Sequence, residues 1–179
     1  VFQELGKNKE AVSCYRRAIK LNPEYVEAHY NLGTAYQELG EYKEAVSAYQ
    51  KVIQIDFKYI KAHNNLGLVY KELGKYKEAV SCYQRAIELN PDYAEAHYNL
   101  GLVNQELGKY QEAASAYQKA IQIDFKYIKA HNNLGNVLQE LRKNQEAVSC
   151  YQRAIELNPD YAEAHNNLGN VLQELRKNQ

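Results

Sequence analysis

The sequence has no net charge, no tryptophan, no methionine and no long apolar run. Its 22 basic and 22 acidic residues cancel, so there is no net electrostatic field to hold nucleic acid or an anionic membrane surface. No stretch approaches the ~20 apolar residues that a membrane-spanning helix needs. We therefore expect a soluble piece of protein whose partner is neither nucleic acid nor a membrane.

What the sequence does contain is a repeat of 34 residues that runs through the whole chain. A fixed period of this length is typical of a solenoid, in which each unit gains a core only by stacking on its neighbours. Function is then expected along an extended surface. The register is marked by a Leu-Gly pair in each repeat: Leu32-Gly33, Leu66-Gly67, Leu100-Gly101, Leu134-Gly135 and Leu168-Gly169.

Each repeat contains two amphipathic helical patterns, which we call its first helix and its second helix. In the repeat that begins at Val26, apolar residues recur at helical spacing up to Leu39 and again from Ala45, with a break at Gly40 between them. We predict eleven helical segments in a single array over 1–179. Its parts are a partial repeat at 1–25, full repeats at 26–59, 60–93, 94–127 and 128–161, and a first helix alone at 162–179.

The glycines fall into two columns. Gly6, Gly40, Gly74 and Gly108 are predicted to end first helices, because glycine adopts the left-handed conformation cheaply. Arg142 and Arg176 occupy this position near the C-terminus, and we expect altered or looser turns there. The other column lies inside first helices, where glycine costs about 1 kcal/mol relative to alanine. This second column therefore predicts that the backbone of the second helix, near Ala45 and its equivalents, comes close to the first helix.

The recurring residues also carry a family resemblance. The pattern His29-x2-Leu32-Gly33-x2-Tyr36 followed by Ala45-x3-Tyr49 resembles a tetratricopeptide repeat, with His where that family most often has Trp. The resemblance covers the whole chain. It implies an all-α solenoid, a right-handed superhelix of stacked antiparallel helix pairs, that acts as a protein-interaction scaffold.

The chain starts without methionine and begins and ends inside a repeat, so we expect a fragment or a processed product. The terminal repeats carry no polar cap of the kind that keeps solenoids soluble. End-to-end association between copies through these ends is the expected consequence.

Columns of identical side chains argue against catalysis, metals and cofactors. The five histidines lie one repeat apart, roughly 10 Å on helix-packing distances, so each is expected to be alone and structural. Catalysis needs different groups that converge on one point, whereas residues related by translation diverge. Cys14, Cys82 and Cys150 are 68 residues apart and cannot pair within one chain. Reduced thiols are weak support for the intracellular, cytoplasmic location that we expect.

One column is a candidate for binding. Asn is a mediocre helix former, yet it recurs in the middle of every first helix. One interpretation is a polar residue that bonds between adjacent first helices. The other is recognition, because an amide can donate to and accept from a peptide backbone. This Asn column consists of Asn31, Asn65, Asn99, Asn133 and Asn167, and the predicted flanking groove residues are Lys61, Lys129, Asn64 and Asn132.

The segment from Cys150 to Pro159, followed by Asn167-Leu168-Gly169, is also similar to the repeat region of O-linked N-acetylglucosamine transferases. That resemblance implies that the Asn column holds extended substrate chains. Our prediction is a non-catalytic scaffold that binds extended peptide segments in a concave groove, without cofactor or metal. The alternatives are the substrate-presenting arm of a larger enzyme such as a glycosyltransferase, and an engineered or purely structural array. A Lys/Arg clamp for a C-terminal carboxylate is not supported, because Asn occupies those positions.

Overall fold

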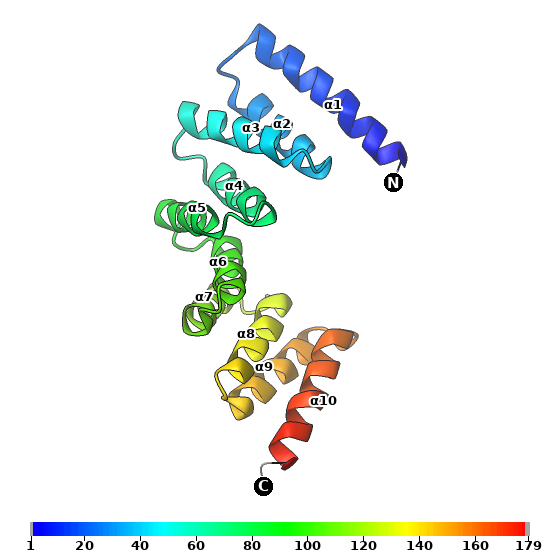
Figure 1. Ribbon diagram of the computed structural model, residues 1–179, viewed down its shortest axis with the longest axis vertical. Helices are drawn as coiled ribbons and strands as arrows, with labels where there is room; N and C mark the ends of the chain where they lie inside the picture. The colour runs from blue at the N-terminus through cyan, green and yellow to red at the C-terminus, as the bar shows by residue number, and fades with distance from the viewer. Residues whose placement is uncertain (1, 178–179) are drawn as a thin grey trace. The chain divides into compact units, whose positions relative to one another are not determined.

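A computed structural model describes residues 2–177 of the chain, with side chains from residue 7 onward. This part of the chain contains ten helices and no strand (Figure 1). None of these helices is both long and apolar enough to cross a lipid bilayer. The helices are α1 (Phe2–Leu21), α2 (Val26–Glu38), α3 (Tyr42–Ile55), α4 (Ile60–Glu72), α5 (Tyr76–Leu89), α6 (Ala94–Glu106), α7 (Tyr110–Ile123), α8 (Ile128–Glu140), α9 (Asn144–Leu157) and α10 (Ala162–Lys177).

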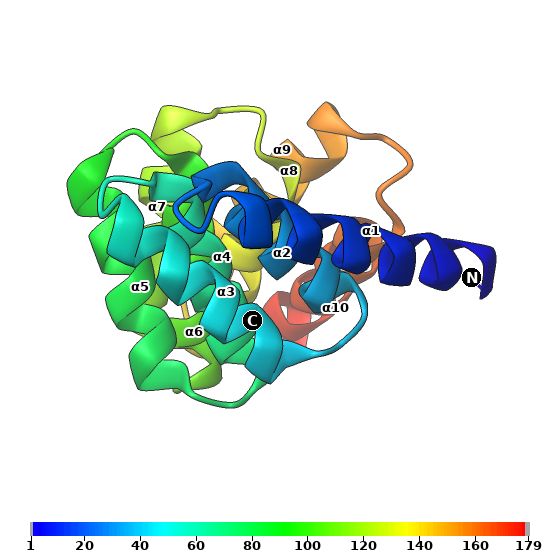
Figure 2. The ribbon, with the colours of Figure 1, turned by 90° about the horizontal axis from the view of Figure 1, so that it is seen from above.

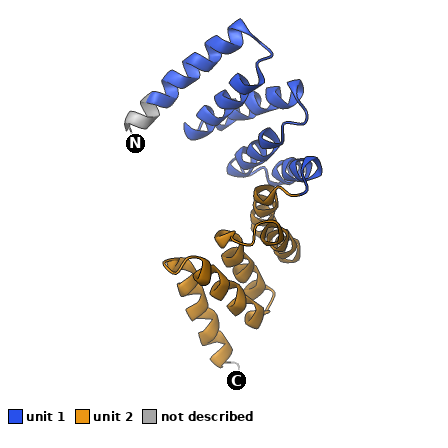
Figure 3. Cartoon of the chain, turned by 180° about the vertical axis from the view of Figure 1, so that it is seen from behind, with its two compact units in different colours: residues 1–91 blue, residues 92–179 orange. Residues whose placement is uncertain are grey.

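The chain divides into two compact units, residues 1–91 and residues 92–179 (Figure 3). Unit 1 contains α1 to α5 and unit 2 contains α6 to α10. The even-numbered helices are the first helices of the predicted repeats and the odd-numbered helices are the second helices.

Within each unit, helices that are consecutive in the sequence pack against each other. In unit 1, α2 packs on α3 and α4 on α5, and α2 also touches α4. In unit 2, α6 packs on α7, α7 on α8 and α8 on α9, as the views from the side and from above show (Figure 1, Figure 2). These contacts confirm the predicted all-α solenoid of stacked helix pairs.

Of the four turns that join a first helix to a second helix in the described residues, one differs from the prediction. Gly40, Gly74 and Gly108 have φ of 73°, 70° and 69°, as expected for glycines that end helices. Arg142 has the same left-handed conformation, with φ of 60°. The turn is also closed in the same way, because the N–H of Lys143 donates to Leu138 O at 2.8 Å, as Lys75 does to Tyr70 O. The expected loosening at Arg142 is therefore wrong: packing of α8 on α9 imposes the turn despite the β-carbon.

At the two ends of the chain no such turn forms. α1 runs through Gly6 without a break, and α10 continues through Arg176. The described residues therefore form ten helices rather than the eleven predicted. The reason is that a turn is needed only where a first helix folds back on a second helix. In the described part of the chain, α1 has too few residues before Gly6 to form such a helix, and no helix follows α10.

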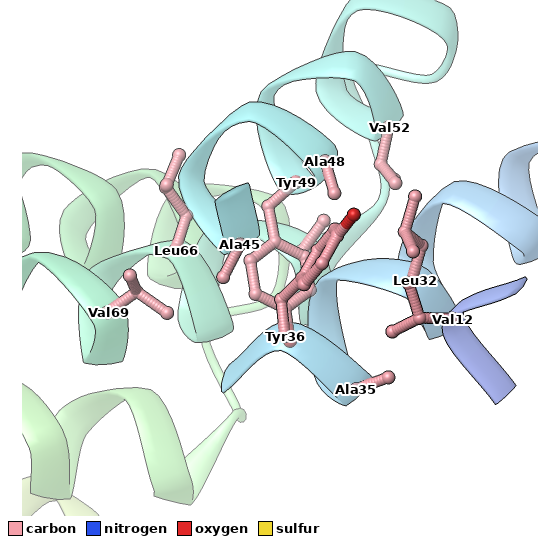
Figure 4. Packing of buried hydrophobic residues seen from close by; sticks show 11 residues of the cluster. Val12, Leu32, Ala35, Tyr36, Ala45, Ala48, Tyr49, Val52, Leu66 and Val69 are labelled. Atoms are coloured by element: carbon pink, nitrogen blue, oxygen red, sulfur yellow. The ribbon is translucent and has the colours of Figure 1, made fainter. Parts of the chain in front are cut away.

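The glycines inside first helices make room for a tyrosine side chain rather than for a backbone. A Cβ atom added to Gly33 of α2 would lie 2.7 Å from Cε1 of Tyr49 on α3. Tyr49 is fully buried, and Figure 4 shows it in the core between α2 and α3, near Ala45 and Leu32. The predicted close approach is correct, but the partner is an aromatic ring. The same pairing recurs as Gly67 with Tyr83, Gly101 with Tyr117 and Gly135 with Tyr151.

Candidate functional site

The Asn column connects neighbouring first helices. In unit 1, Nδ2 of Asn65 on α4 donates to the hydroxyl of Tyr30 on α2 at 3.0 Å and, at 3.4 Å, to that of Tyr49. In unit 2, Nδ2 of Asn133 on α8 donates to the hydroxyl of Tyr98 on α6 at 3.1 Å. These are bonds of the kind that the first interpretation of the column describes. They fix the orientation of both amides.

The other three members of the column have different surroundings. Asn31 on α2 is exposed, whereas Asn99 on α6 is buried. Asn167 on α10 uses both N–H groups, donating to Oδ1 of Asn132 at 3.1 Å and to Oδ1 of Asn136 at 3.0 Å. The column is therefore regular in sequence but not in exposure.

Two of the predicted flanking residues do not reach the surface. Asn64 and Asn132 have no exposed area, so their side chains cannot contact a ligand directly. Tyrosines occupy this column in other repeats, and the shorter amide side chain stays in the layer between helices. Asn132 instead supports its surroundings, because its Nδ2 donates to Oε1 of Glu163 at 2.8 Å. Lys61 and Lys129 are exposed, as a flanking role requires.

Each unit contains a cluster of three tyrosines beside the Asn column. The ring centroids of Tyr30 and Tyr59 are 5.1 Å apart, and those of Tyr98 and Tyr127 are 4.8 Å apart. Tyr49 and Tyr117 complete the two clusters, each with its centroid 5.7 Å from its neighbour. Desolvation by burial raises the pKa of Tyr49, Tyr59, Tyr98, Tyr117 and Tyr127. The five hydroxyls with raised pKa stay neutral and serve as hydrogen-bond partners.

A polar pocket of about 470 Å³ lies between the first helices α8 and α10 of unit 2. At one side Nη1 of Arg142 lies 3.2 Å from Oε1 of Glu174. The hydroxyl of Tyr151 donates to either Oδ1 of Asn136 at 2.8 Å or Oε1 of Gln139 at 2.5 Å. The lining comprises Asn136, Gln139 and Glu140 from α8, Arg142 from the turn, and Glu163, Asn167 and Glu174 from α10.

The sequence does not predict this pocket, although Asn167 belongs to the predicted binding column. The missed signal is Asn136, which stands where two repeats have Leu68 and Leu102 and two others have the polar residues Thr34 and Asn170. A polar residue that replaces leucine at one position of a repeat indicates a local change of surroundings. Here its Oδ1 accepts from Nδ2 of Asn167 and shares the hydroxyl proton of Tyr151 with Gln139.

The histidines hold the turns that precede the first helices. Nε2–H of His29 donates to the carbonyl oxygen of Pro23 at 2.8 Å, and His63 does the same to Phe57 at 2.9 Å. His131 and His165 repeat the bond with Phe125 and Pro159. This is the structural role that their spacing predicted. In the part of the chain that the structure describes, no three His, Cys, Asp or Glu side chains lie close enough to share a metal ion.

The cysteines do not form a reactive site. Cys82 and Cys150 are partly buried on second helices, and desolvation raises the pKa of their thiols to about 12 and about 11. A thiol with such a pKa stays protonated at neutral pH and is a poor nucleophile. All three are free cysteines, as expected from their separation.

Comparison with known proteins agrees with this architecture. A family model described as TPR repeat matches residues 1–40, 35–74, 68–108 and 140–175, and one described as Tetratricopeptide repeat matches residues 94–127. No curated protein sequence matches the chain closely enough to count as a relative.

Several solved structures are similar to the chain. A crystal structure of MamA is 30% identical with a TM-score of 0.82, over 90% of this chain and 94% of that one. YrrB, described as a TPR protein with an unusual peptide-binding site, is 26% identical with a TM-score of 0.76, over 92% and 84%. The first TPR of Spaghetti (RPAP3), bound to the HSP90 peptide SRMEEVD, is 30% identical with a TM-score of 0.64, over 65% and 93%.

These three structures are not described as glycosyltransferases, so the likeness to the repeat region of O-linked N-acetylglucosamine transferases stays a prediction. What the matches do share is the helix-pair repeat and, in two of them, a bound peptide or a peptide site. Both the fold and the family models agree with the role of a protein-interaction scaffold. The chain belongs to the tetratricopeptide repeat family.

Proposed function

We propose that this protein binds extended polypeptide segments along the first-helix face of its units and has no catalytic chemistry of its own. The observation that carries the proposal is the fixed orientation of the amides of Asn65 and Asn133. Their Nδ2 atoms are held by tyrosine hydroxyls, which leaves Oδ1 as the group that can accept a backbone N–H. Among the described residues, each Oδ1 accepts one long hydrogen bond, with a donor–acceptor distance of 3.4 Å, from Nδ2 of the adjacent asparagine.

This refines the role expected from the sequence. The amide was expected to donate to and accept from a bound peptide at the same time. At Asn65 and Asn133, whose Nδ2 atoms donate to tyrosine hydroxyls, the column offers Oδ1 as an acceptor to the peptide. These Oδ1 atoms can accept hydrogen bonds from backbone N–H groups, which every residue except proline carries. Binding would then depend little on the identity of the bound side chains.

The spacing of the first helices fits an extended ligand. Adjacent packed helices are roughly 8–10 Å apart, and an extended chain rises about 3.3 Å per residue. Successive members of the column within one unit would therefore meet every third residue of the ligand. Several weak contacts of this kind add up to modest affinity because the ligand is held at all of them together.

The similar structures support the proposal. YrrB is described as having a peptide-binding site, and the first TPR of Spaghetti is described as bound to a peptide. Transfer of that property to this chain is part of the proposal. The absence of catalytic chemistry is proposed because the chemically active residue types recur in columns instead of converging on one point.

The test is binding of a library of fluorescent twelve-residue peptides to the full chain, measured by anisotropy. Replacement of Asn65 and Asn133 together by Ala should weaken binding about fivefold or more if each lost contact contributes about 0.5–1.5 kcal/mol. The matched variant with Asp at the same positions keeps the acceptor oxygens and should bind better than the Ala variant. Far-UV circular dichroism monitors helicity. Equal affinity of the wild type and a folded Ala variant would remove the Asn column from the binding site.

A further inference from the structure

The pocket between α8 and α10 carries more acid than base. Glu140, Glu163 and Glu174 face a single cation, Arg142, which pairs with Glu174 at 3.2 Å. Glu140 and Glu163 are left without a cationic partner among the described residues. The pocket therefore has an excess of about two negative charges.

Glu163 is held in place inside this pocket. Its Oε1 accepts from Nδ2 of Asn132 at 2.8 Å and its Oε2 accepts from the hydroxyl of Tyr161 at 3.1 Å. A carboxylate can accept about four hydrogen bonds. Glu163 therefore has a fixed orientation and retains capacity to accept from a bound donor.

Another acceptor in the pocket is available in the same way. Asn167 donates its two N–H groups to Asn132 and Asn136, so its Oδ1 is the atom that remains to bind a ligand. Among the contacts of the described residues, no donor reaches that oxygen. Two carboxylates and a carbonyl oxygen together suit a ligand that only donates. Arg and Lys are the side chains with donors and no acceptor.

A small metal ion is a poorer fit. It would need its oxygen ligands within about 2.0–2.6 Å. Among the described residues, no three His, Cys, Asp or Glu side chains lie close enough to surround one ion. A cation that carries several separated N–H groups can reach acceptors that lie farther apart.

The chain contains a matched site with a different charge. Residues one hundred and two positions earlier, three repeats back, occupy the corresponding positions on α2, on α4 and in the turn after α2 in unit 1. There Lys61 stands in place of Glu163, Thr34 in place of Asn136 and Gly40 in place of Arg142. Lys61 is exposed, so the unit 1 surface presents a cation where the unit 2 pocket presents a held carboxylate.

We propose that the pocket between α8 and α10 is a specificity site for a basic side chain, arginine or lysine, of the bound segment. The identification of the ligand as part of a polypeptide rests on the proposed function. Glu163 and Glu140 supply the charge, and Asn167 supplies a further acceptor. The corresponding surface of unit 1 excludes the same side chain through Lys61.

The pocket is tested first without a peptide. Full-length protein labelled with ¹⁵N is titrated with Nα-acetyl-arginine methylamide, with the lysine equivalent and with the citrulline equivalent, which is neutral. The side-chain NH₂ signals of Asn136, Gln139 and Asn167 report on the pocket. We expect saturable shifts with the arginine or lysine compound that weaken at high salt, and no shift with citrulline. Equal shifts with citrulline, or shifts confined to other regions, would overturn the proposal.

Variants test the named charges. Glu163→Lys copies Lys61 and should weaken the interaction about tenfold, because an attractive pair becomes a repulsive one. Glu140→Gln is the second variant if Glu163→Lys does not fold, and it should weaken the interaction about threefold. The control is Glu112→Gln on α7, which contributes nothing to the pocket and should leave the shifts unchanged. If folded Glu163→Lys bound the arginine or lysine compound as tightly as the wild type, the assignment of the pocket to a basic side chain would be wrong.

A final comparison separates this proposal from the scaffold function. Peptides that differ only in arginine or citrulline are compared for binding to the full chain. If they bind equally well, the specificity site is wrong while the scaffold function stands. If no peptide binds but the arginine compound still shifts the pocket signals, the scaffold function is wrong while the cation site stands.

Discussion

Gly135 of α8 lies against the ring of Tyr151 of α9, so closely that a Cβ atom at Gly135 would be 2.5 Å from Cε1 of the ring. Tyr151 is fully buried, so the ring has little room to move away. The glycine is thus required by the size of its neighbour. Four of the five first-helix glycines share this relationship, and Gly169 on α10 does not, because no atom lies within 4 Å of its added Cβ.

Replacement of Gly135 by Ala should therefore lower the free energy of unfolding, by about 1–3 kcal/mol as for other overpacked cores. Gly169→Ala is the matched control. Gly169 is exposed inside a helix, so alanine should raise the free energy of unfolding by up to about 1 kcal/mol. Urea unfolding followed by circular dichroism measures both. Equal effects of the two substitutions would contradict the steric explanation.

Arg142→Gly should stabilise the protein. Arg142 has φ of 60°, a region that costs a residue with a β-carbon roughly 1–2 kcal/mol. The substitution also removes the ion pair with Glu174, but the Arg142 side chain is 83% exposed and such pairs contribute about 0–1 kcal/mol. We expect a net gain of about 0.5–1 kcal/mol in urea unfolding. Arg176 lies inside α10, so Arg176→Gly should lower the free energy of unfolding or leave it unchanged.

His131→Ala should destabilise unit 2 by about 1–2 kcal/mol, because the carbonyl oxygen of Phe125 loses the Nε2–H donor at 3.0 Å in a buried position. His165 makes the same bond with Pro159 at 2.9 Å but is exposed. Water can replace the lost donor there, so His165→Ala should cost less. Thermal unfolding of the two variants compares them, and a larger loss for His165→Ala would be inconsistent with this role.

Alkaline pH should unfold the protein through its buried tyrosines. Burial raises the pKa of Tyr49 and Tyr117 in the folded chain, whereas tyrosine in the unfolded chain ionises at about 10. The stabilisation is complete below about pH 10 and is lost as the pH rises from there through the folded pKa values, because the unfolded chain releases its protons first. Urea unfolding at increasing pH measures the loss. In Tyr117→Phe the free energy of unfolding should fall less steeply with rising pH. An identical slope would argue against ionisation of buried tyrosines as the cause.

The repeat and its helices follow from the sequence alone. The helical spacing from Ala28 to Leu39 and the break at Gly40 predict both helices of a pair and the turn between them, because these features depend on residues within one repeat. The period then predicts that the same helix pairing recurs. The tyrosine cluster of Tyr30 reappears around Tyr98, two repeats later, because the repeat between them has Asn64 at this position. The packing columns were therefore identified without coordinates.

The tertiary structure decided which of these residues are available to a ligand. Asn64 and Asn65 are neighbours on one helix, yet one is fully buried and the other donates to Tyr30, thirty-five residues away. The pocket at Asn136 likewise depends on Asn167 and Tyr151, which come from two other helices. Periodicity determines which side of a helix faces its partner. It does not determine which polar atoms meet across the interface, because those contacts depend on side-chain length and on residues from other repeats.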